Sequence, residues 1–291
     1  MANPVFNSSD VFGEPRRGRA GTATSQGPVQ YGTAGYGTTA QAGVDAASLE
    51  TMYGAPSATT RDTKRLTYDD VIVKTAGLLV LLVAVAAVAW YLTPTMPYLL
   101  WIGMLGGLVL GLVNAFKREP SPALIIGYTV FEGMLLGQIS FLFQYIVVEG
   151  TTTGTAQPIV LQAVLATFAT FGAALALYSS GKVRVTPKFT RFLLVAMGGY
   201  LLFSLLNFGL SFFMASDGFG PLRNGGWGIL AGLVGVVLAS MSLIVDFDSI
   251  KRGVQRGVPA RYAWSAAFGL MVTLIWLYLE LLRLLAIFNR N

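Results

Sequence analysis

The chain has 291 residues, of which 54% are hydrophobic and only 12% are charged, and its formal net charge is +6. Soluble domains carry about a quarter charged residues, so this composition indicates a non-aqueous solvent for much of the chain. The sequence contains no cysteine and no histidine, which excludes disulfides and thiolate catalysis and removes the commonest general base and metal ligand.

The first part of the chain is polar and rich in glycine. Residues 1–30 contain no apolar run of the kind found in a signal peptide. Residues 1–62 cannot bury enough apolar surface to offset the entropy of ordering. We therefore predict two regions, a disordered cytoplasmic tail over 1–62 and a transmembrane domain over 63–291. The tail is expected to act as a tether, with partner recruitment through Tyr31 and Tyr36 as the alternative.

Seven long apolar segments follow the tail. Thr67 is expected to cap the first helix, with Asp69 and Asp70 in its positive first turn. About 20 helical residues cross ~30 Å of hydrocarbon, and each segment is close to that length. The predicted helices cover 71–92, 98–116, 122–148, 158–178, 189–214, 226–250, and a last one that starts between 262 and 269 and ends near 288. The predicted fold class is all-α, a polytopic membrane protein built as a seven-helix bundle.

Lysine and arginine alternate between the two sides of these helices. The connections 93–97 and 149–157 contain no basic residue, and 214–225 contains only Arg223. The start of the first helix and the other three connections are basic, through Lys64, Arg65, Lys74, Lys117, Arg118, Lys182, Arg184, Lys188, Arg191, Lys251, Arg252, Arg256 and Arg261. The positive-inside rule then places the N-terminus in the cytoplasm and the C-terminus outside, in the cell (plasma) membrane.

Ionisable side chains inside apolar segments are costly unless they are paired or hydrated, so each is a functional-site hypothesis. They are Glu132, Asp246, Asp248, Glu280 and Arg283. Asp246 ends a face of small residues at helical spacing, which lets a neighbouring helix approach closely. That face consists of Gly228, Gly232, Gly235, Ala239, Ser242 and Asp246. We expect Asp246 to be buried at this contact, as a sensor or as a hydrogen-bonded packing residue.

The other ionisable residues have structural alternatives. Asp248 points away from Asp246 by about 200° and lies near the cytoplasmic end, where a solvated carboxylate is expected. Glu280 and Arg283 are three residues apart and can pair within one helix. Glu132 has no face of small residues beside it.

Neutral polar residues and glycine motifs also mark helix contacts. The polar residues of the third and fifth helices either bond between helices or line a hydrated path; they are Gln138, Ser140, Gln144, Tyr200, Ser204, Asn207 and Ser211. Glycines four residues apart, Gly103, Gly107 and Gly111 in one helix and Gly133 and Gly137 in the next, predict close packing of helices.

Several function classes lack their motifs. The last lysine is Lys251, so no lysine stands in the seventh helix to carry a retinal Schiff base. The sequence has no Gly-x-Gly-Asp segment, no Gly-x-Ser-x-Gly elbow and no Walker-type phosphate loop. We therefore expect neither an enzyme nor a bound cofactor, and no nucleic-acid partner.

Five segments resemble the Bax inhibitor-1 (transmembrane BAX inhibitor motif) family, especially its actinobacterial-type branch. They are Val245-Asp246-Phe247-Asp248-Ser249-Ile250, Trp276-Leu277-Tyr278-Leu279-Glu280-Leu281-Leu282-Arg283, Glu132-Gly133-Met134-Leu135-Leu136-Gly137, and the pair Asn3-Pro4-Val5-Phe6 and Thr67-Tyr68-Asp69-Asp70-Val71. The resemblance covers about residues 65–291. It is most specific in the last two helices.

The resemblance implies a bundle with the last helix at its centre and a pH-sensitive calcium leak through it. The family's two acids would correspond to Asp246 and Glu280 as pH sensor and gate, and when deprotonated they would supply hard oxygen ligands to Ca²⁺. Asp248, Arg283, Glu132 and Asn207 would line the path or act as partners. The second acid is Glu rather than the usual Asp, and if the last helix starts at Tyr262 it lies ~27 Å along that helix, out of reach of Asp246.

Two further functions stay open at this point. A non-conducting membrane scaffold would regulate membrane proteases or stress responses through the tail and through membrane protein partners. A secondary transporter is a third option, although no inverted repeat is visible in the sequence. The expected partners in the main hypothesis are the lipid bilayer and calcium or other cations.

Overall fold

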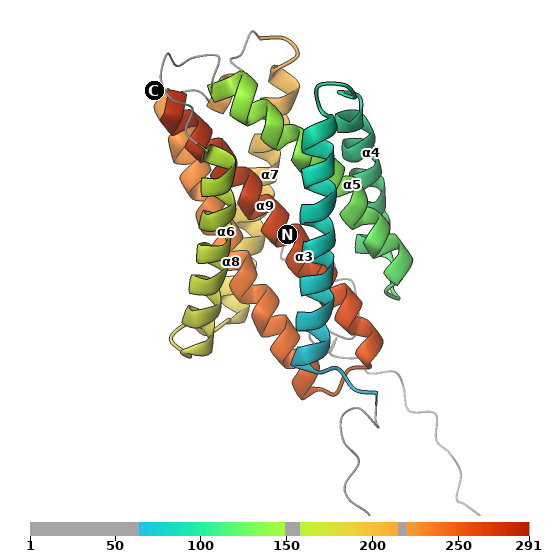
Figure 1. The fold of residues 1–291 in the computed structure, drawn as a ribbon. Helices are drawn as coiled ribbons and strands as arrows, with labels where there is room; N and C mark the ends of the chain where they lie inside the picture. The colour runs from blue at the N-terminus through green and yellow to red at the C-terminus, as the bar shows by residue number, and fades with distance from the viewer. Residues whose placement is uncertain (1–63, 149–157, 215–219, 224, 291) are drawn as a thin grey trace, which may run out of the picture. The chain divides into compact units, whose positions relative to one another are not determined.

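The computed structural model describes residues 64–148, 158–214, 220–223 and 225–290. The tail predicted over 1–62 lies outside this range. Within the described residues, seven helices are long and apolar enough to cross a membrane. The predicted all-α, seven-helix membrane fold is therefore confirmed (Figure 1).

The helices match the apolar segments closely. They are α3 (Tyr68–Leu92), α4 (Leu99–Phe116), α5 (Pro122–Phe141) with its π-helical continuation η1 (Leu142–Val148), α6 (Ile159–Ser179), α7 (Pro187–Leu210), α8 (Gly225–Gln255) and α9 (Ala263–Arg290). Two 3₁₀ turns, η2 (Pro221–Arg223) and η3 (Ala260–Tyr262), precede α8 and α9. Thr67 is the N-cap of α3, as predicted, and it also forms a capping box in which Thr67 and Asp70 exchange hydrogen bonds.

Two helix ends differ from the prediction. Helix α8 continues past the expected end at Ile250 to Gln255, because a helix can leave the apolar layer without ending and hydropathy reports only the part inside it. Helix α7 ends at Leu210 rather than Met214, although the residues after it are apolar. The Ser211 hydroxyl donates to the Phe208 carbonyl at 2.6 Å there, and the chain turns.

Helix α9 lies at the centre of the bundle. It packs against α3, α5, α6 and α8, while α4 packs mainly on α5 and α7 mainly on α8 (Figure 1). In its most apolar stretch 61% of the residues are buried, against 17% in α3 and in α7. The outer helices expose large apolar side chains, which is the expected surface of a protein whose solvent is lipid. Any change in the position of α9 therefore reaches most of the bundle.

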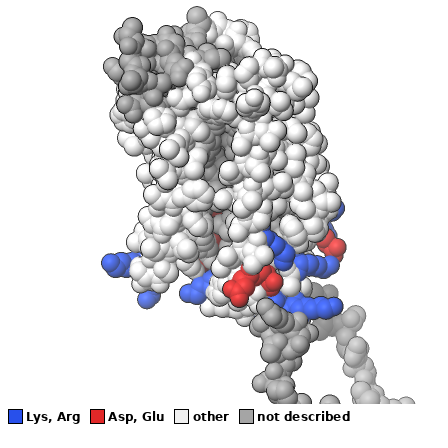
Figure 2. Space-filling model, viewed as in Figure 1, with Lys and Arg blue, Asp and Glu red and all other residues white. Residues whose placement is uncertain are grey.

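Most of the lysines and arginines gather at one end of the helices, which we call the basic end (Figure 2). We call the opposite end the far end. The basic end holds the start of α3 and the turn between α8 and α9. The Leu66 amide donates to the Val258 carbonyl at 2.6 Å, so these two segments are joined. The far end holds the end of α3, the start of α6 and η2 (Figure 1).

Candidate functional site

The two C-terminal helices pack closely along a row of small residues, as the sequence predicts. All six members of the row on α8 are buried. The helices run antiparallel, since a Cβ added at Gly228 would meet Ile287 and one added at Gly235 would lie 2.9 Å from the Glu280 carboxyl carbon. This α8–α9 contact, which we call the seam, carries both predicted acids.

Asp246 lies in the half of the seam nearer the basic end and is fully buried. The Thr273 hydroxyl of α9 donates to Asp246 Oδ2 at 2.7 Å. The same hydroxyl lies 3.3 Å from the Gly269 carbonyl one turn earlier on α9. A neutral hydroxyl of the central helix is thus in direct contact with a buried carboxylate.

Glu280 lies in the half of the seam nearer the far end and is 3% exposed. Its carboxylate accepts from Arg283 Nη1 at 3.1 Å and from Trp276 Nε1 at 3.3 Å. Arg223 Nη1 lies 3.5 Å from Glu280 Oε2. The predicted pair with Arg283 is therefore present, and a second arginine joins it.

The structure does not bring Asp246 and Glu280 together, so the expected diacid pair is not formed. Helix α9 starts at Ala263, which puts Glu280 17 residues, or about 26 Å, along it. The partner of Asp246 on α9 is Thr273, seven residues or about 10 Å before Glu280. Only residues 256–262 separate the two antiparallel helices. Asp246 of α8 therefore faces Thr273 of α9, whereas Glu280 faces Gly235.

Arg223 is the residue that the sequence analysis did not recognise as part of the site. Its side chain, from η2, is 3% exposed. Its Nη2 donates to Ser204 Oγ at 2.8 Å, and its guanidinium lies 5.1 Å and 5.3 Å from the ring centroids of Tyr200 and Phe203. Its position in the sequence was the available signal, because Arg223 is the only basic residue in connections that otherwise have none. Such an isolated arginine is a candidate for burial as the partner of an acid.

Asp248 lies nearer the basic end and faces away from the seam. It forms an ion pair with Arg252 one turn later, and Tyr178 of α6 donates to its Oδ1 at 3.2 Å. Its side chain is 17% exposed, against full burial for Asp246. The predicted division between a buried and an interfacial aspartate is confirmed.

The remaining predicted residues hold helices and connections together. A Cβ at Gly107 of α4 would lie 2.8 Å from Glu132 Oε1, so Glu132 packs in the α4–α5 contact. Asn207 accepts the Leu222 amide at 2.9 Å and thereby fixes η2 beside α7. Gln138 donates to the Met96 carbonyl at 3.1 Å. These polar residues were expected either to bond between helices or to line a hydrated path. Asn207 and Gln138 form bonds between segments.

No group of three or more acidic side chains that could hold a metal ion occurs within the residues described above. Asp246 and Glu280 cannot share one ion at their separation. Glu280 is also engaged by two cations, which compete with any Ca²⁺ for its oxygens.

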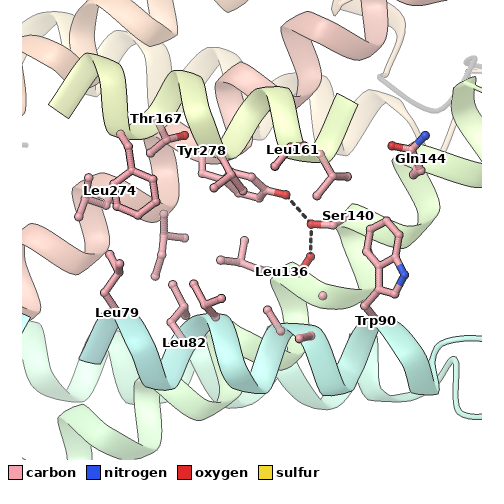
Figure 3. A pocket seen from close by; sticks show the side chains of 18 of the residues that line it. Leu79, Leu82, Trp90, Leu136, Ser140, Gln144, Leu161, Thr167, Leu274 and Tyr278 are labelled. Carbon is pink, nitrogen blue, oxygen red and sulfur yellow. Dashed lines mark hydrogen bonds between the residues drawn. The ribbon is translucent and has the colours of Figure 1, made fainter. Parts of the chain in front are cut away.

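A groove of about 660 Å³ lies between α3 and α6, with α9 as its floor (Figure 3). Leu79 and Leu274 lie toward one of its ends, and Trp90 and Gln144 lie at the other (Figure 3). Its wall contains one polar pair, Ser140 Oγ and Tyr278 Oη, which are 2.6 Å apart.

The sequence model of one protein family, described as Bax inhibitor 1 like, matches residues 3–290. No curated protein and no solved structure matches the chain significantly.

Proposed function

This chain belongs to the Bax inhibitor 1 like family, and we propose that it is a pH-sensitive cation leak, chiefly for calcium, with Asp246 as its proton sensor. The observation that supports this function is the buried carboxylate of Asp246, which bonds across the seam to a neutral hydroxyl of the central helix. An ionisable group inside a membrane protein is expensive to keep and marks ion or proton pathways. Transport, rather than catalysis, is the function that such a group favours here.

The proposed switch is a change in hydrogen bonding between α8 and α9. An ionised carboxylate only accepts hydrogen bonds, so it accepts one from the Thr273 hydroxyl. A protonated carboxyl also has a proton to donate, and the Thr273 oxygen can then become the acceptor. Because α9 contacts α3, α5, α6 and α8, a shift at this bond reaches the packing of the whole bundle.

We assign Glu280 a different role from the one that the resemblance implies. Two guanidinium groups stand at one carboxylate in the far half of the seam, so the local charge there is positive. A cation crossing this level meets repulsion from Arg223 and Arg283. The cluster of Arg223, Glu280 and Arg283, which we call the arginine clamp, is proposed to keep the far half closed.

The proposal is tested by calcium entry into liposomes that contain the purified full-length protein and a trapped calcium-sensitive dye, recorded across a range of pH. We expect wild-type flux to depend on pH and Asp246→Asn to remove that dependence. The matched control is Asp248→Asn on the same helix, whose acid is partly exposed and should leave the dependence in place. A pH response that survives in Asp246→Asn, or wild-type vesicles that take up no calcium, would overturn the proposal.

We further propose that the basic end faces the cytoplasm of the cell membrane, so that the C-terminus lies outside. The one-sided distribution of Lys and Arg supports this orientation (Figure 2). The chain has no cysteine, so single cysteines can report topology without a background. A membrane-impermeant maleimide added to intact cells should label Thr95→Cys and not Ser180→Cys. The reverse pattern would invert the orientation.

A further inference from the structure

We propose that the groove between α3 and α6 is a binding site for one acyl chain of a membrane phospholipid, with the headgroup at the far end. This site is separate from the seam, and the proposal does not depend on whether ions pass through the protein.

The groove opens sideways, toward the lipid. Helices α3 and α6 form its two walls without packing against one another along their lengths, and α9 closes it from behind. The space-filling view is hollowed on the face between these two helices (Figure 2). Val83 on one wall and Leu161 on the other are 54% and 56% exposed. Both walls are membrane-spanning helices, so the molecules next to the opening are lipids.

The chemistry of the groove favours an apolar chain over water or an ion. Its volume lies in the range of ligand pockets, and its wall is mostly aliphatic and aromatic (Figure 3). The Ser140 and Tyr278 hydroxyls bond to each other, and Ser140 also donates to the Leu136 carbonyl at 2.5 Å. The Thr167 hydroxyl donates to the Ala163 carbonyl at 2.7 Å. A buried water needs two to four polar partners, and these hydroxyls are already bonded to backbone carbonyls or to each other.

The direction of the chain follows from the aromatic residues at one end. Trp90 lies near the end of α3 and packs against Tyr145, with their ring centroids 5.7 Å apart. Tryptophan and tyrosine favour the level of the lipid headgroups. The other end of the groove, at Leu79 and Leu274, lies near the middle of α3 and α9 (Figure 3). The acyl chain therefore enters beside Trp90 and extends along α9 toward Leu274.

The occupant would contact the same helix that carries the partner of Asp246. Leu274 and Ile275 form part of the floor, and Thr273 directly precedes them on α9. An acyl chain in the groove supports α9 from the side opposite to the seam. Removing it leaves the floor residues with fewer packing contacts.

The test uses the full-length protein in nanodiscs of phosphatidylcholine that contain a small fraction of the same lipid with a diazirine near the end of one acyl chain. After irradiation, mass spectrometry locates the labelled residues. We expect label on Leu274 and Ile275, which are each only 6% exposed and are out of reach of lipid that merely surrounds the protein. Label on Leu105 and Leu108 of α4, both 57% exposed, reports ordinary surrounding lipid.

Paired variants separate a filled groove from general contact with lipid. Val83→Trp fills the groove and should lower label on the floor about tenfold, the factor expected if about two methylenes lose their contacts. Val80→Trp, on the same helix and 68% exposed but outside the groove, should leave the floor label unchanged. Label on α4 should stay constant in both.

Equal floor labelling in the two α3 variants, or no floor label in the wild type while α4 is labelled, would overturn the site. If Val83→Trp does not fold, the pair Leu161→Trp and Leu165→Trp on α6 makes the same comparison. Leu161 lines the groove and Leu165 does not, and both are more than half exposed. The same two outcomes then decide the proposal.

Discussion

The two halves of the seam hold one buried acid each and treat it in opposite ways. In the half nearer the basic end, Asp246 faces a neutral hydroxyl; in the far half, Glu280 faces two guanidinium groups. An acid between cations cannot gain a proton without giving up ion pairs. An acid bonded to a hydroxyl can exchange donor and acceptor roles with its partner. Burial of a carboxylate therefore does not by itself favour a role as proton sensor, because the partner decides whether protonation is tolerated.

The largest expected effect breaks the far half. Glu280→Gln leaves Arg223, which is 3% exposed, without its counter-charge, and loss of one partner from a buried pair costs about 3–5 kcal/mol. Arg223→Gln should cost clearly less, because Arg283 still neutralises Glu280. Unfolding titrations in mixed detergent micelles measure both free energies. Equal losses, or a larger loss in Arg223→Gln, would show that the clamp does not work as described.

Arg223→Gln also tests the closing role that we propose for the clamp. Removal of one guanidinium from the far half should raise calcium flux at every pH and leave its pH dependence intact. The liposome measurement described above provides both quantities. Unchanged flux in a variant that still folds would limit the clamp to a structural role, without affecting the role of Asp246.

The next largest effect concerns how closely the helices approach. A Cβ at Gly137 of α5 would lie 2.8 Å from the Ala89 Cβ and 2.9 Å from the Trp90 amide nitrogen of α3. Gly137→Ala should therefore destabilise the fold by about 1–3 kcal/mol through overpacking. Gly198→Ala in α7 is the matched control, since no atom lies within 4 Å of the added group and alanine favours a helix. Similar behaviour of both variants in the same unfolding assay would contradict the packing argument.

The sequence was sufficient to predict the helices and the α8 side of the seam. Hydropathy located all seven spans, and the spacing of small residues identified the buried face of α8 that ends in Asp246. It was not sufficient for the partner of Asp246. Which residue of α9 faces it depends on the length of the turn between the helices, and the apolar pattern of 262–269 does not define where the helix starts. Arg223 was missed because hydropathy does not show that a loop folds back into the bundle, and the one available sign was its isolation among connections without other basic residues.

An effect of comparable size should come from the half of the seam nearer the basic end. Thr273→Val removes the hydrogen bond to Asp246 while keeping the side-chain shape, and a hydrogen bond to a charged group contributes about 1.5–3 kcal/mol. The pH dependence of calcium flux should change as well, because the carboxylate loses the partner with which it exchanges roles. Thr273→Ser keeps the hydroxyl and should restore both properties. A serine variant that behaves like the valine variant would mean that the methyl group, and not the hydroxyl, matters at this position.

The smallest effect is expected at the third acid, which completes the comparison. Asp248 and Arg252 form an ion pair one turn apart, and their side chains are 17% and 38% exposed. Water and salt screen such a pair, so Asp248→Asn should cost about 0–1 kcal/mol, part of it through the bond from Tyr178. The loss should shrink in high salt, whereas the losses at Glu280 and Thr273 should not, because those groups are buried. Unfolding titrations at low and high salt test this. A large, salt-independent loss would show that Asp248 behaves as a second buried acid near the basic end, and would remove the contrast that supports the proposed sensor role of Asp246.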